Sequence, residues 1–326
     1  MSRMLRTVLS LVGAAACVFW TSQCWAQATI LRVGIPVYSW SQSLNPYFKQ
    51  FEAALAQHGW IAGKNVILEY RSPKSDTLEL TEACEELVRL KVDVILAASA
   101  PSLHAAYAAT RVIPIIAWDG TTDPVAAGYA ESYAHPGKNV TGLFLDAPEF
   151  AGKWLDILRS LVPKLKRVAV LYDPTPGAVH LRAVEGAALR LGVKTYVYEV
   201  RKPEDIKRAF AAMRNRPQAV IIVPSPMLVD QSKLLADLAK KAKLPATSLL
   251  RSFTEVGGAV SYGPSLADAM QRLAVMVAKI LEGAKPSDIP IERPTKFDFL
   301  YNMSTMRALN LKVPESLLLG AEMVGK

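Results

Sequence analysis

The sequence predicts an α/β protein built from two doubly wound lobes with parallel sheets, joined by a hinge of several strands. Short runs rich in β-forming residues alternate with helical patterns from Leu31 onward, in two successive series of four strands each. Strands that alternate with helices are typical of parallel sheets with right-handed crossovers. We therefore expect an N-terminal lobe over residues 27–141 and a C-terminal lobe over residues 142–256.

The first series begins at residue 31. Residues 92–97 form a nearly continuous apolar run, as expected of a strand covered on both faces. After the first strand, Phe48, Phe51 and Leu55 fall on one face of a helix. The predicted strands cover residues 31–37, 65–70, 92–97 and 113–118, with helices around residues 48–55, 80–88 and 102–109.

The second series opens with a helix lined by Phe150, Trp154 and Leu158. Pro203 marks a helix start, because proline fits the first helical turn. Asp230 can cap the last helix of the series. The predicted strands cover residues 167–172, 194–200, 219–223 and 245–249, and the other helices include residues 178–191, 203–213 and 234–238.

Residues 257–326 are too few for a further domain, so we expect hinge crossings and a tail that packs back on the lobes. A strand at 257–262 precedes a helix over 266–281, with Ser265 and Asp268 as a capping pair. An extended segment and a short helix follow. Several crossings make a hinge that bends without releasing the lobes. The candidate crossings lie near residues 139–145, 257–264 and 290–299.

Residues 1–26 have the pattern of a secretory signal peptide. Arg3 and Arg6 precede an apolar run that ends near Trp20 and is shorter than the ~20 residues of a membrane-spanning helix. Small residues then allow cleavage after Ala26, which we favour, or after Ala28. The alternatives are an uncleaved anchor and lipidation at Cys24, which the preceding glutamine disfavours.

Cleavage after residue 26 leaves Cys84 as the last cysteine, so no intramolecular disulfide is possible. Cys84 falls on an apolar helical stripe and is interpreted as a small core residue. Loss of Arg3 and Arg6 lowers the formal net charge from +9 to +7. The remaining lysines and arginines are scattered among acidic residues, which disfavours a nucleic-acid partner.

A series of short stretches along the chain has the order and spacing of one known family. The stretches are His58-Gly-Trp60, Gly63-Lys-Asn-Val66, Val92-Asp-Val-Ile-Leu96, Thr122-Asp-Pro-Val125, His135-Pro-Gly-Lys-Asn-Val-Thr-Gly142, Gly152-Lys-Trp-Leu155, Arg167-Val-Ala-Val-Leu171, residues 257–266, Glu282-Gly-Ala-Lys-Pro286 and Pro294-Thr-Lys-Phe297. With these stretches the chain resembles the substrate-binding proteins of bacterial ABC transporters, in the group with tryptophan-binding members. The resemblance covers nearly the whole mature chain and implies a two-lobe, type I-like periplasmic binding protein. The chain departs from the family at Ala98-Ser-Ala-Pro101, where Asn-Thr-Pro is frequent, and at Trp118 and Asp119.

Ligands of open parallel sheets bind beyond the carboxyl ends of the strands, and two facing lobes place both sets of ends on one cleft. The candidate ligand-binding residues therefore follow the predicted strands or lie at a crossing. They are Tyr38, Ser39, Ser99, Pro101, Ser102, Trp118, Asp119, Thr122, Pro174, Pro224, Ser225 and Tyr262.

These residue types suit a small carboxylate with an apolar or aromatic body. Ser99 and Ser102 flank a helix start, where free N–H groups favour an anion. Asp119 suits a ligand ammonium, and Trp118 and Tyr262 offer rings for stacking. Each has a plainer interpretation: Ser102 caps its helix, Asp119 fixes a turn and the tryptophan belongs to the core.

No catalytic, metal or cofactor motif accompanies these residues. The four histidines lack ligand spacing, and the chain has no phosphate loop, no Gly-x-Gly-x-x-Gly after the first strand and no Gly-x-Ser-x-Gly elbow. We expect no metal, no cofactor and no enzyme activity. A secreted enzyme on the same scaffold stays as an alternative.

The resemblance implies a monomeric periplasmic protein that binds a small organic solute by hinge closure and docks on an ABC transporter permease. An amino acid or an aromatic carboxylate is the favoured solute. A periplasmic ligand sensor that docks on a receptor is an alternative that the sequence does not separate from transport. A transcription regulator is disfavoured, because the export signal occupies the place of a helix-turn-helix segment.

Overall fold

The computed structural model describes residues 30–37, 45–72, 77–213 and 217–325. All the helices and strands named below belong to one unit, residues 31–326. The predicted signal peptide and the predicted site residues Tyr38 and Ser39 lie outside the described residues.

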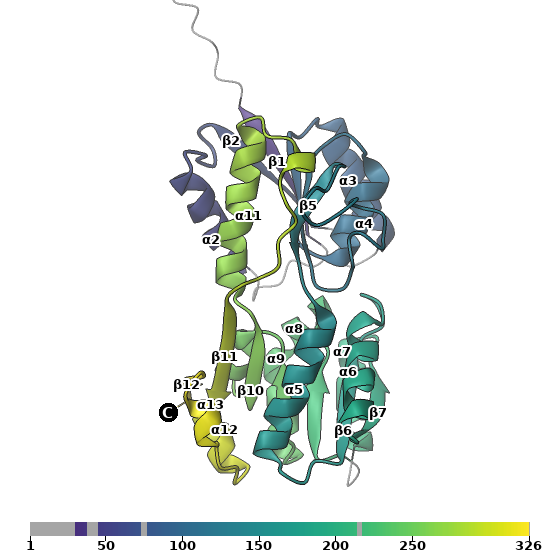
Figure 1. Cartoon of the computed structure of the whole chain (residues 1–326), viewed down its shortest axis with the longest axis vertical. Coiled ribbons are helices and arrows are strands. Elements are labelled where there is room, and N and C mark those ends of the chain that lie inside the picture. Colours follow the sequence, from purple (N-terminus) through teal and green to yellow (C-terminus); the bar gives the residue numbers. More distant parts are fainter. Residues whose placement is uncertain (1–29, 38–44, 73–76, 214–216, 326) are drawn as a thin grey trace, which may run out of the picture. The chain divides into compact units, whose positions relative to one another are not determined.

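The first sheet has five strands in the order β2-β1-β3-β4-β5, and every pairing is parallel. The buried run in the sequence lies in its centre, as β3. The strands are β1 (Leu31–Pro36), β2 (Val66–Arg71), β3 (Val94–Ala97), β4 (Ile115–Asp119) and β5 (Val140–Phe144) (Figure 1).

Strand β5 differs from the sequence-based expectation, which assigned residues 139–145 to a crossing and placed a lobe boundary after residue 141. Gly142 explains the difference. It has φ +140°, and a Cβ there would lie 2.1 Å from the carbonyl oxygen of Ala117 on β4. Glycine therefore allows β5 to join the sheet at close approach, and the chain leaves the first sheet only after Phe144.

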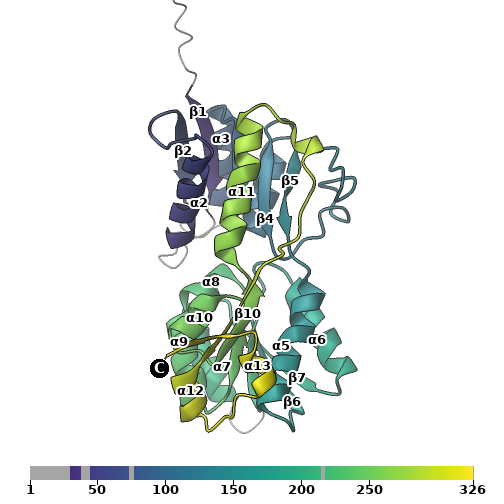
Figure 2. The same cartoon turned by 60° about the vertical axis from the view of Figure 1, so that its left-hand side comes forward.

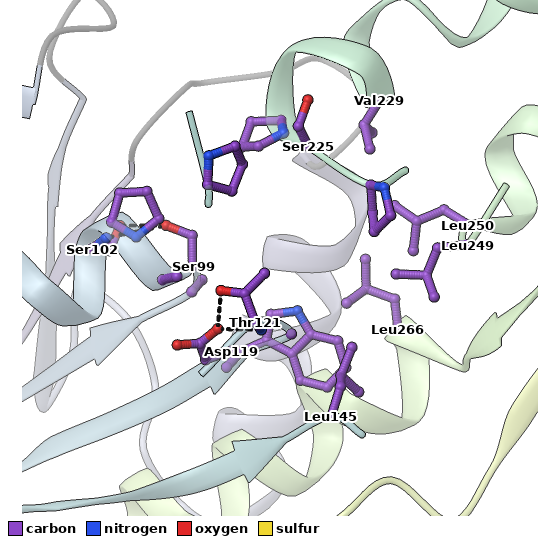
Figure 3. Close-up of a pocket in the computed structure, with 18 of the residues that line it drawn as sticks. Ser99, Ser102, Asp119, Thr121, Leu145, Ser225, Val229, Leu249, Leu250 and Leu266 are labelled. Carbon is purple, nitrogen blue, oxygen red and sulfur yellow. Dashed lines mark hydrogen bonds between the residues drawn. The ribbon is translucent and has the colours of Figure 1, made fainter. Parts of the chain in front are cut away.

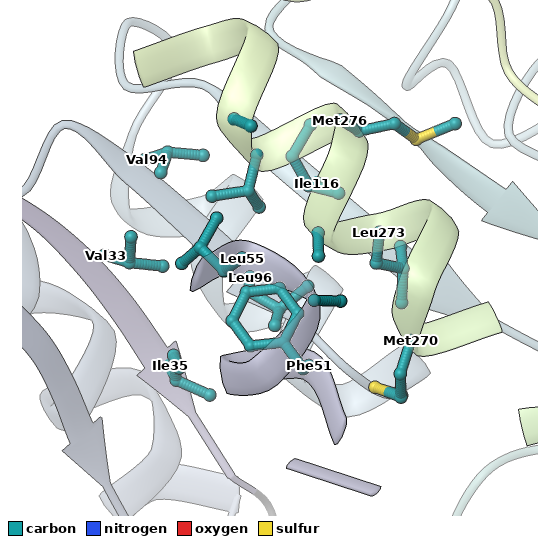
Figure 4. Close-up of a cluster of buried hydrophobic side chains, with 14 of the residues drawn as sticks. Val33, Ile35, Phe51, Leu55, Val94, Leu96, Ile116, Met270, Leu273 and Met276 are labelled. Atoms are coloured by element: carbon teal, nitrogen blue, oxygen red, sulfur yellow. The ribbon is translucent and has the colours of Figure 1, made fainter. Parts of the chain in front are cut away.

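Helices cover both faces of this sheet. On one face α3 (Thr77–Arg89) and α4 (Ala100–Ala109) bury an apolar cluster that includes Leu87 and Leu103. On the other face α2 (Asn45–Gln57) packs beside α11 (Leu266–Leu281), as Figure 2 shows. Phe51 of α2 and Leu273 of α11 meet Ile116 of β4 in that layer (Figure 4).

The second sheet has seven strands in the order β12-β11-β10-β9-β8-β6-β7. Its pairings are parallel except for the antiparallel pair β10–β11. Strands β6 to β10 repeat the order of the first sheet. The strands are β6 (Arg167–Tyr172), β7 (Lys194–Glu199), β8 (Ala219–Ile222), β9 (Ala246–Ser248), β10 (Val260–Pro264), β11 (Phe297–Asn302) and β12 (Glu322–Val324).

The second sheet is also covered on both faces. Helices α5 (Ala147–Leu161) and α6 (Val179–Arg190) pack on one face, and α7 (Pro203–Ala212) and α9 (Ser232–Lys241) on the other. The shorter helices are α8 (Pro226–Asp230), α10 (Arg251–Glu255), η1 (Pro286–Asp288), α12 (Met303–Ala308) and α13 (Glu315–Leu318).

Two predicted helix caps are wrong. Asp230 is the last residue of α8, and Gln231 precedes α9. Helix α8 forms because Ser225 and Pro226 make a helix start of their own, with the Ser225 hydroxyl accepting from the N–H of Leu228. Ser265 precedes α11 but makes no side-chain capping bond, and Asp268 instead pairs with Lys296 at 2.5 Å.

The chain passes between the two sheets three times. It leaves the first sheet after β5, returns after β10 to form α11, and leaves again before β11. Hydrogen bonds connect the crossings: Glu292 N–H donates to the Gly142 carbonyl at 2.9 Å, and Ser265 N–H donates to the Lys296 carbonyl at 2.9 Å. An ion pair of 2.8 Å between Arg293 and Asp146 joins the first crossing to the third.

Cys84 is fully buried in α3, which confirms its interpretation as a core residue. Burial raises the pKa of its thiol to about 12. None of the helices within the described part of the chain is long and apolar enough to span a membrane.

Replacing Leu273 with alanine should lower the free energy of unfolding by about 2–5 kcal/mol, because it opens a cavity between α11 and the first sheet. Leu189→Ala is the matched control. Leu189 lies on α6 and is 81% exposed, so its loss should cost less than about 0.5 kcal/mol. Urea unfolding followed by circular dichroism measures both, and equal losses would contradict the assigned packing.

Candidate ligand-binding site

A cavity of about 160 Å³ lies at the carboxyl ends of strands from both sheets. In each sheet the strand order reverses next to the first strand of its series, between β1 and β3 and between β6 and β8, and such switch points are where α/β folds bind ligands. Pro36 is the last residue of β1, Ser99 follows β3, and Pro224 and Ser225 follow β8. Figure 3 shows Ser99, Asp119 and Ser225 around this cavity.

Ser99 begins α4 at the first-sheet side. Its Oγ accepts from the N–H of Ser102 at 3.3 Å and donates to the Ser102 hydroxyl at 2.9 Å. The Ser102 hydroxyl donates in turn to the Pro36 carbonyl at 2.8 Å. This chain of bonds ties the start of α4 to the end of β1, and it leaves the first turn of the helix at the cavity wall.

Ser225 is the counterpart of Ser99 on the second sheet. It is buried, and its Oγ accepts from the N–H of Leu228 at 3.2 Å to begin α8. Pro101 and Pro226 occupy the first turns of the two helices, where proline loses no helical hydrogen bond. The same local sequence, serine followed by a proline-containing first turn, thus forms the cavity wall on both sides.

Asp119 ends β4 and is fully buried. Its Oδ1 accepts from the N–H of Thr121 at 2.7 Å and from the Thr121 hydroxyl at 3.0 Å, so the side chain fixes the turn after the strand. Its Oδ2 has no hydrogen-bond partner among the described residues. Burial, with a smaller contribution from the Asp119 charge, raises the pKa of the nearby Tyr129 phenol to about 12.

His180, in the first turn of α6, reaches the cavity from the second sheet. It is 2% exposed, and its ring lies 6.3 Å from that of Trp154. Burial lowers the pKa of His180 to about 4, and a hydrogen bond with the Gly120 main chain partly offsets this. The imidazole is therefore neutral at pH 7.

The structure brings most of the predicted site residues together. Contact of any of them with a ligand stays a prediction. The residues on the cavity lining are Ser99, Pro101, Ser102, Trp118, Asp119, Pro224 and Ser225.

Three other predicted residues do not line this cavity: Thr122, Pro174 and Tyr262. The Tyr262 ring stacks on Phe297 at 5.8 Å, and its carbonyl accepts from Trp154 Nε1 at 2.8 Å. Tyr262 therefore belongs to an aromatic cluster of the second sheet.

Several lining residues were missed. Tyr47 and Phe48 lie in the first turn of α2, the helix that follows β1. Extending the search from the end of that strand to the start of the next helix would have found them. Leu266 and Met270 line the cavity from α11. No local signal identifies these two, because their position depends on the return of the chain to the first sheet.

The lining is mostly apolar and carries little charge. No lysine or arginine belongs to it among the described residues, and the one carboxylate is that of Asp119. Across residues 30–37, 45–72, 77–213 and 217–325, no group of three or more His, Cys, Asp or Glu side chains is arranged to hold a metal ion.

Asp119→Ala should lower the free energy of unfolding by about 1–3 kcal/mol, because it leaves the N–H and hydroxyl of Thr121 without their acceptor. Asp123→Ala is the control: Asp123 accepts from two main-chain N–H groups of an exposed turn, and its loss should cost less than about 1 kcal/mol. Thermal unfolding measures the difference, and equal midpoints would remove Asp119 from its structural role.

Comparisons with known proteins relate this chain to a family and to solved structures. A family model described as ABC transporter substrate binding protein matches residues 32–324. A tyrosine-binding protein of Clostridioides difficile strain R20291 is 24% identical over 287 residues, which are 86% of this chain and 81% of that protein.

Two solved structures share the fold. A conserved domain protein of Vibrio cholerae O1 biovar El Tor strain N16961 has a TM-score of 0.83 at 24% identity, covering 90% of this chain and 99% of that one. An ABC domain of Streptococcus pneumoniae in complex with L-Trp has a TM-score of 0.82 at 21% identity, covering 91% of this chain and 100% of that one. The predicted fold class, with two mainly parallel sheets covered on both faces, is confirmed.

Proposed function

This chain belongs to the ABC transporter substrate-binding protein family, and from that premise we propose that its cavity captures an amino acid with an apolar or aromatic side chain. The observation that carries the proposal is the chemistry of the lining. It is mostly apolar, it contains one carboxylate, and it has no lysine or arginine among the described residues.

The size of the cavity suits one apolar side chain. Its volume of about 160 Å³ is close to the ~150 Å³ of an apolar cavity that accepts benzene. Trp118 and Phe48 offer rings to the ligand body, and Leu250 offers an aliphatic surface from the second sheet. A tyrosine-binding protein and a protein in complex with L-Trp are among the similar proteins, which agrees with an aromatic side chain of the ligand.

The start of α4 suits the carboxylate of the ligand. Ala100, which lines the cavity, supplies the first main-chain N–H of the helix there. The positive end of the helix dipole favours an anion at this position, so the site can bind a carboxylate without a cationic side chain.

The charge of the lining favours a ligand that also carries an ammonium. A carboxylic acid without an amine would bring a second negative charge toward Asp119, and no cationic side chain of the lining would compensate it. A zwitterion adds no net charge. This argument separates the two solutes that the sequence left open and favours the amino acid over the aromatic carboxylate.

The remaining parts of the proposal follow from the sequence. Residues 1–26 would direct the chain to the periplasm, where the monomer would close on its solute and dock on the permease of its transporter. The three linked crossings support hinge closure, because they allow rotation of the lobes while the chain stays connected at several points.

The wild-type protein should bind L-phenylalanine at least about tenfold more tightly than 3-phenylpropanoate, which is the same molecule without its amine. Asp119→Asn keeps an oxygen for Thr121 and removes the charge, so it should bring the two affinities to within about threefold. Titration calorimetry at pH 7.5 measures both ligands, and Asp123→Asn on an exposed turn is the control.

Two outcomes would contradict the proposal. One is that none of L-phenylalanine, L-tyrosine and L-tryptophan binds. The other is that the wild-type protein takes 3-phenylpropanoate as tightly as L-phenylalanine, which would restore the aromatic carboxylate as a candidate.

Hinge closure should appear in solution as a smaller radius of gyration. Small-angle scattering of the mature chain, with and without saturating L-phenylalanine or whichever of the three amino acids binds most tightly, measures the change. An unchanged radius at saturation would show that binding does not close the cleft.

A further inference from the structure

We infer that His180 fastens the second lobe to the main chain of the first when the cleft is closed, and that this contact weakens ligand capture in acid. The inference rests on the proposed function, because it assumes that the lobes close on a solute. It concerns a residue that is buried at the cavity and has one ring nitrogen without a partner.

The contact joins elements of different sheets. Helix α6, which carries His180, packs on the second sheet through Val184 and Ala188. Gly120 directly follows β4 of the first sheet. Of the His180 ring atoms, Nε2 lies nearest to the position that a Cβ of residue 120 would take. A Cβ built at Gly120 would lie 3.6 Å from Nε2, at ordinary van der Waals contact, so the imidazole packs directly against the main chain at Gly120. When the lobes separate, the imidazole and the Gly120 carbonyl would both become hydrated.

The positions of the two ring nitrogens favour a neutral imidazole. The hydrogen bond with the Gly120 main chain favours the protonated ring, so a ring N–H donates to the Gly120 carbonyl. Nδ1 is buried and has no partner within the described residues. A second proton would therefore make Nδ1 a buried donor without an acceptor. It would also give the buried ring a positive charge, which is costly away from water.

Burial and the Gly120 bond are the causes that shift the pKa of His180, and no charged group is among them. Asp119 keeps one oxygen, Oδ2, without a partner among the described residues, whereas the other charged groups on the elements around His180 have partners. On the first-sheet side, Asp119 accepts from Thr121, and Asp146 pairs with Arg293. On the second-sheet side, Asp173, which follows β6, accepts from the Thr175 N–H. Lys153 of α5 lies over the Tyr262 ring, and the positive charge of Arg182 of α6 acts to lower the pKa of Tyr172.

The sign of the effect follows from the two states. In the closed form burial lowers the pKa of His180 to about 4, whereas a hydrated histidine in the open form has its ordinary pKa of 6.5. Between these values the open form binds more protons, so closure loses free energy as the pH falls below 6.5. The dissociation constant should therefore rise about 25-fold between pH 7.5 and pH 5.

The test uses the mature chain and whichever of L-phenylalanine, L-tyrosine and L-tryptophan binds most tightly at pH 7.5. Calorimetry at pH 7.5 and 5 compares the wild type with His180→Gln, which keeps a donor for Gly120 but does not titrate. His135→Gln, at an exposed histidine, is the matched control. We expect about 25-fold weakening in the wild type and in the control, and less than about threefold in His180→Gln.

A second measurement needs no variant. Calorimetry of the wild type at pH 5.5 in two buffers of different ionisation enthalpy should show the release of close to one proton on binding. Any of three results would overturn the inference: a wild-type dissociation constant that does not change with pH, no proton release on binding, or the same pH dependence of the dissociation constant in His180→Gln as in the wild type. These results would leave the proposed function intact, whereas absence of binding at pH 7.5 would overturn both.

Discussion

The burial of α11 against the first sheet is the constraint on which the rest of the structure depends. The helix follows β10 of the second sheet, yet its apolar face, with Leu273 and Val277, completes the core on the α2 side of the first sheet. Without it that face of the sheet would expose a large apolar surface. Because the hydrophobic gain requires the helix to lie there, the chain must cross between the lobes and then cross back to form β11.

These crossings connect the core to the cavity. The same helix that covers the first sheet starts at the hinge and places Leu266 and Met270 on the lining. Asp146 begins α5 at another crossing, and its ion pair with Arg293 links two of the three. A rotation of one lobe therefore changes the walls of the cavity through elements that are themselves rigidly packed. The contact of His180 with Gly120 lies among the same elements, which is why its protonation can act on closure.

Regular features were predictable because they depend on local sequence. The central strand β3 is apolar along its length, and Cys84 falls on an apolar helical stripe, so the sequence alone predicts that both lie in the core. Ser99 and Ser225 were predicted at the cavity because each follows a strand, at the carboxyl edge of a sheet where α/β folds bind ligands. Strand β5 was missed, since the glycine that disfavours a strand locally is what permits its close approach to β4.

The sequence by itself determined the two α/β series, the covered sheets and the sheet edge at which a ligand would bind, because strand and helix periodicity and helix capping act over a few residues. The tertiary structure alone decided which side chains share the cavity. The Tyr262 side chain packs in an aromatic cluster and does not line the cavity. His180, one of four histidines without any motif, is buried at the cavity wall. Such placements depend on contacts between segments distant in the chain, and these arise only when the lobes pack and the chain crosses between them.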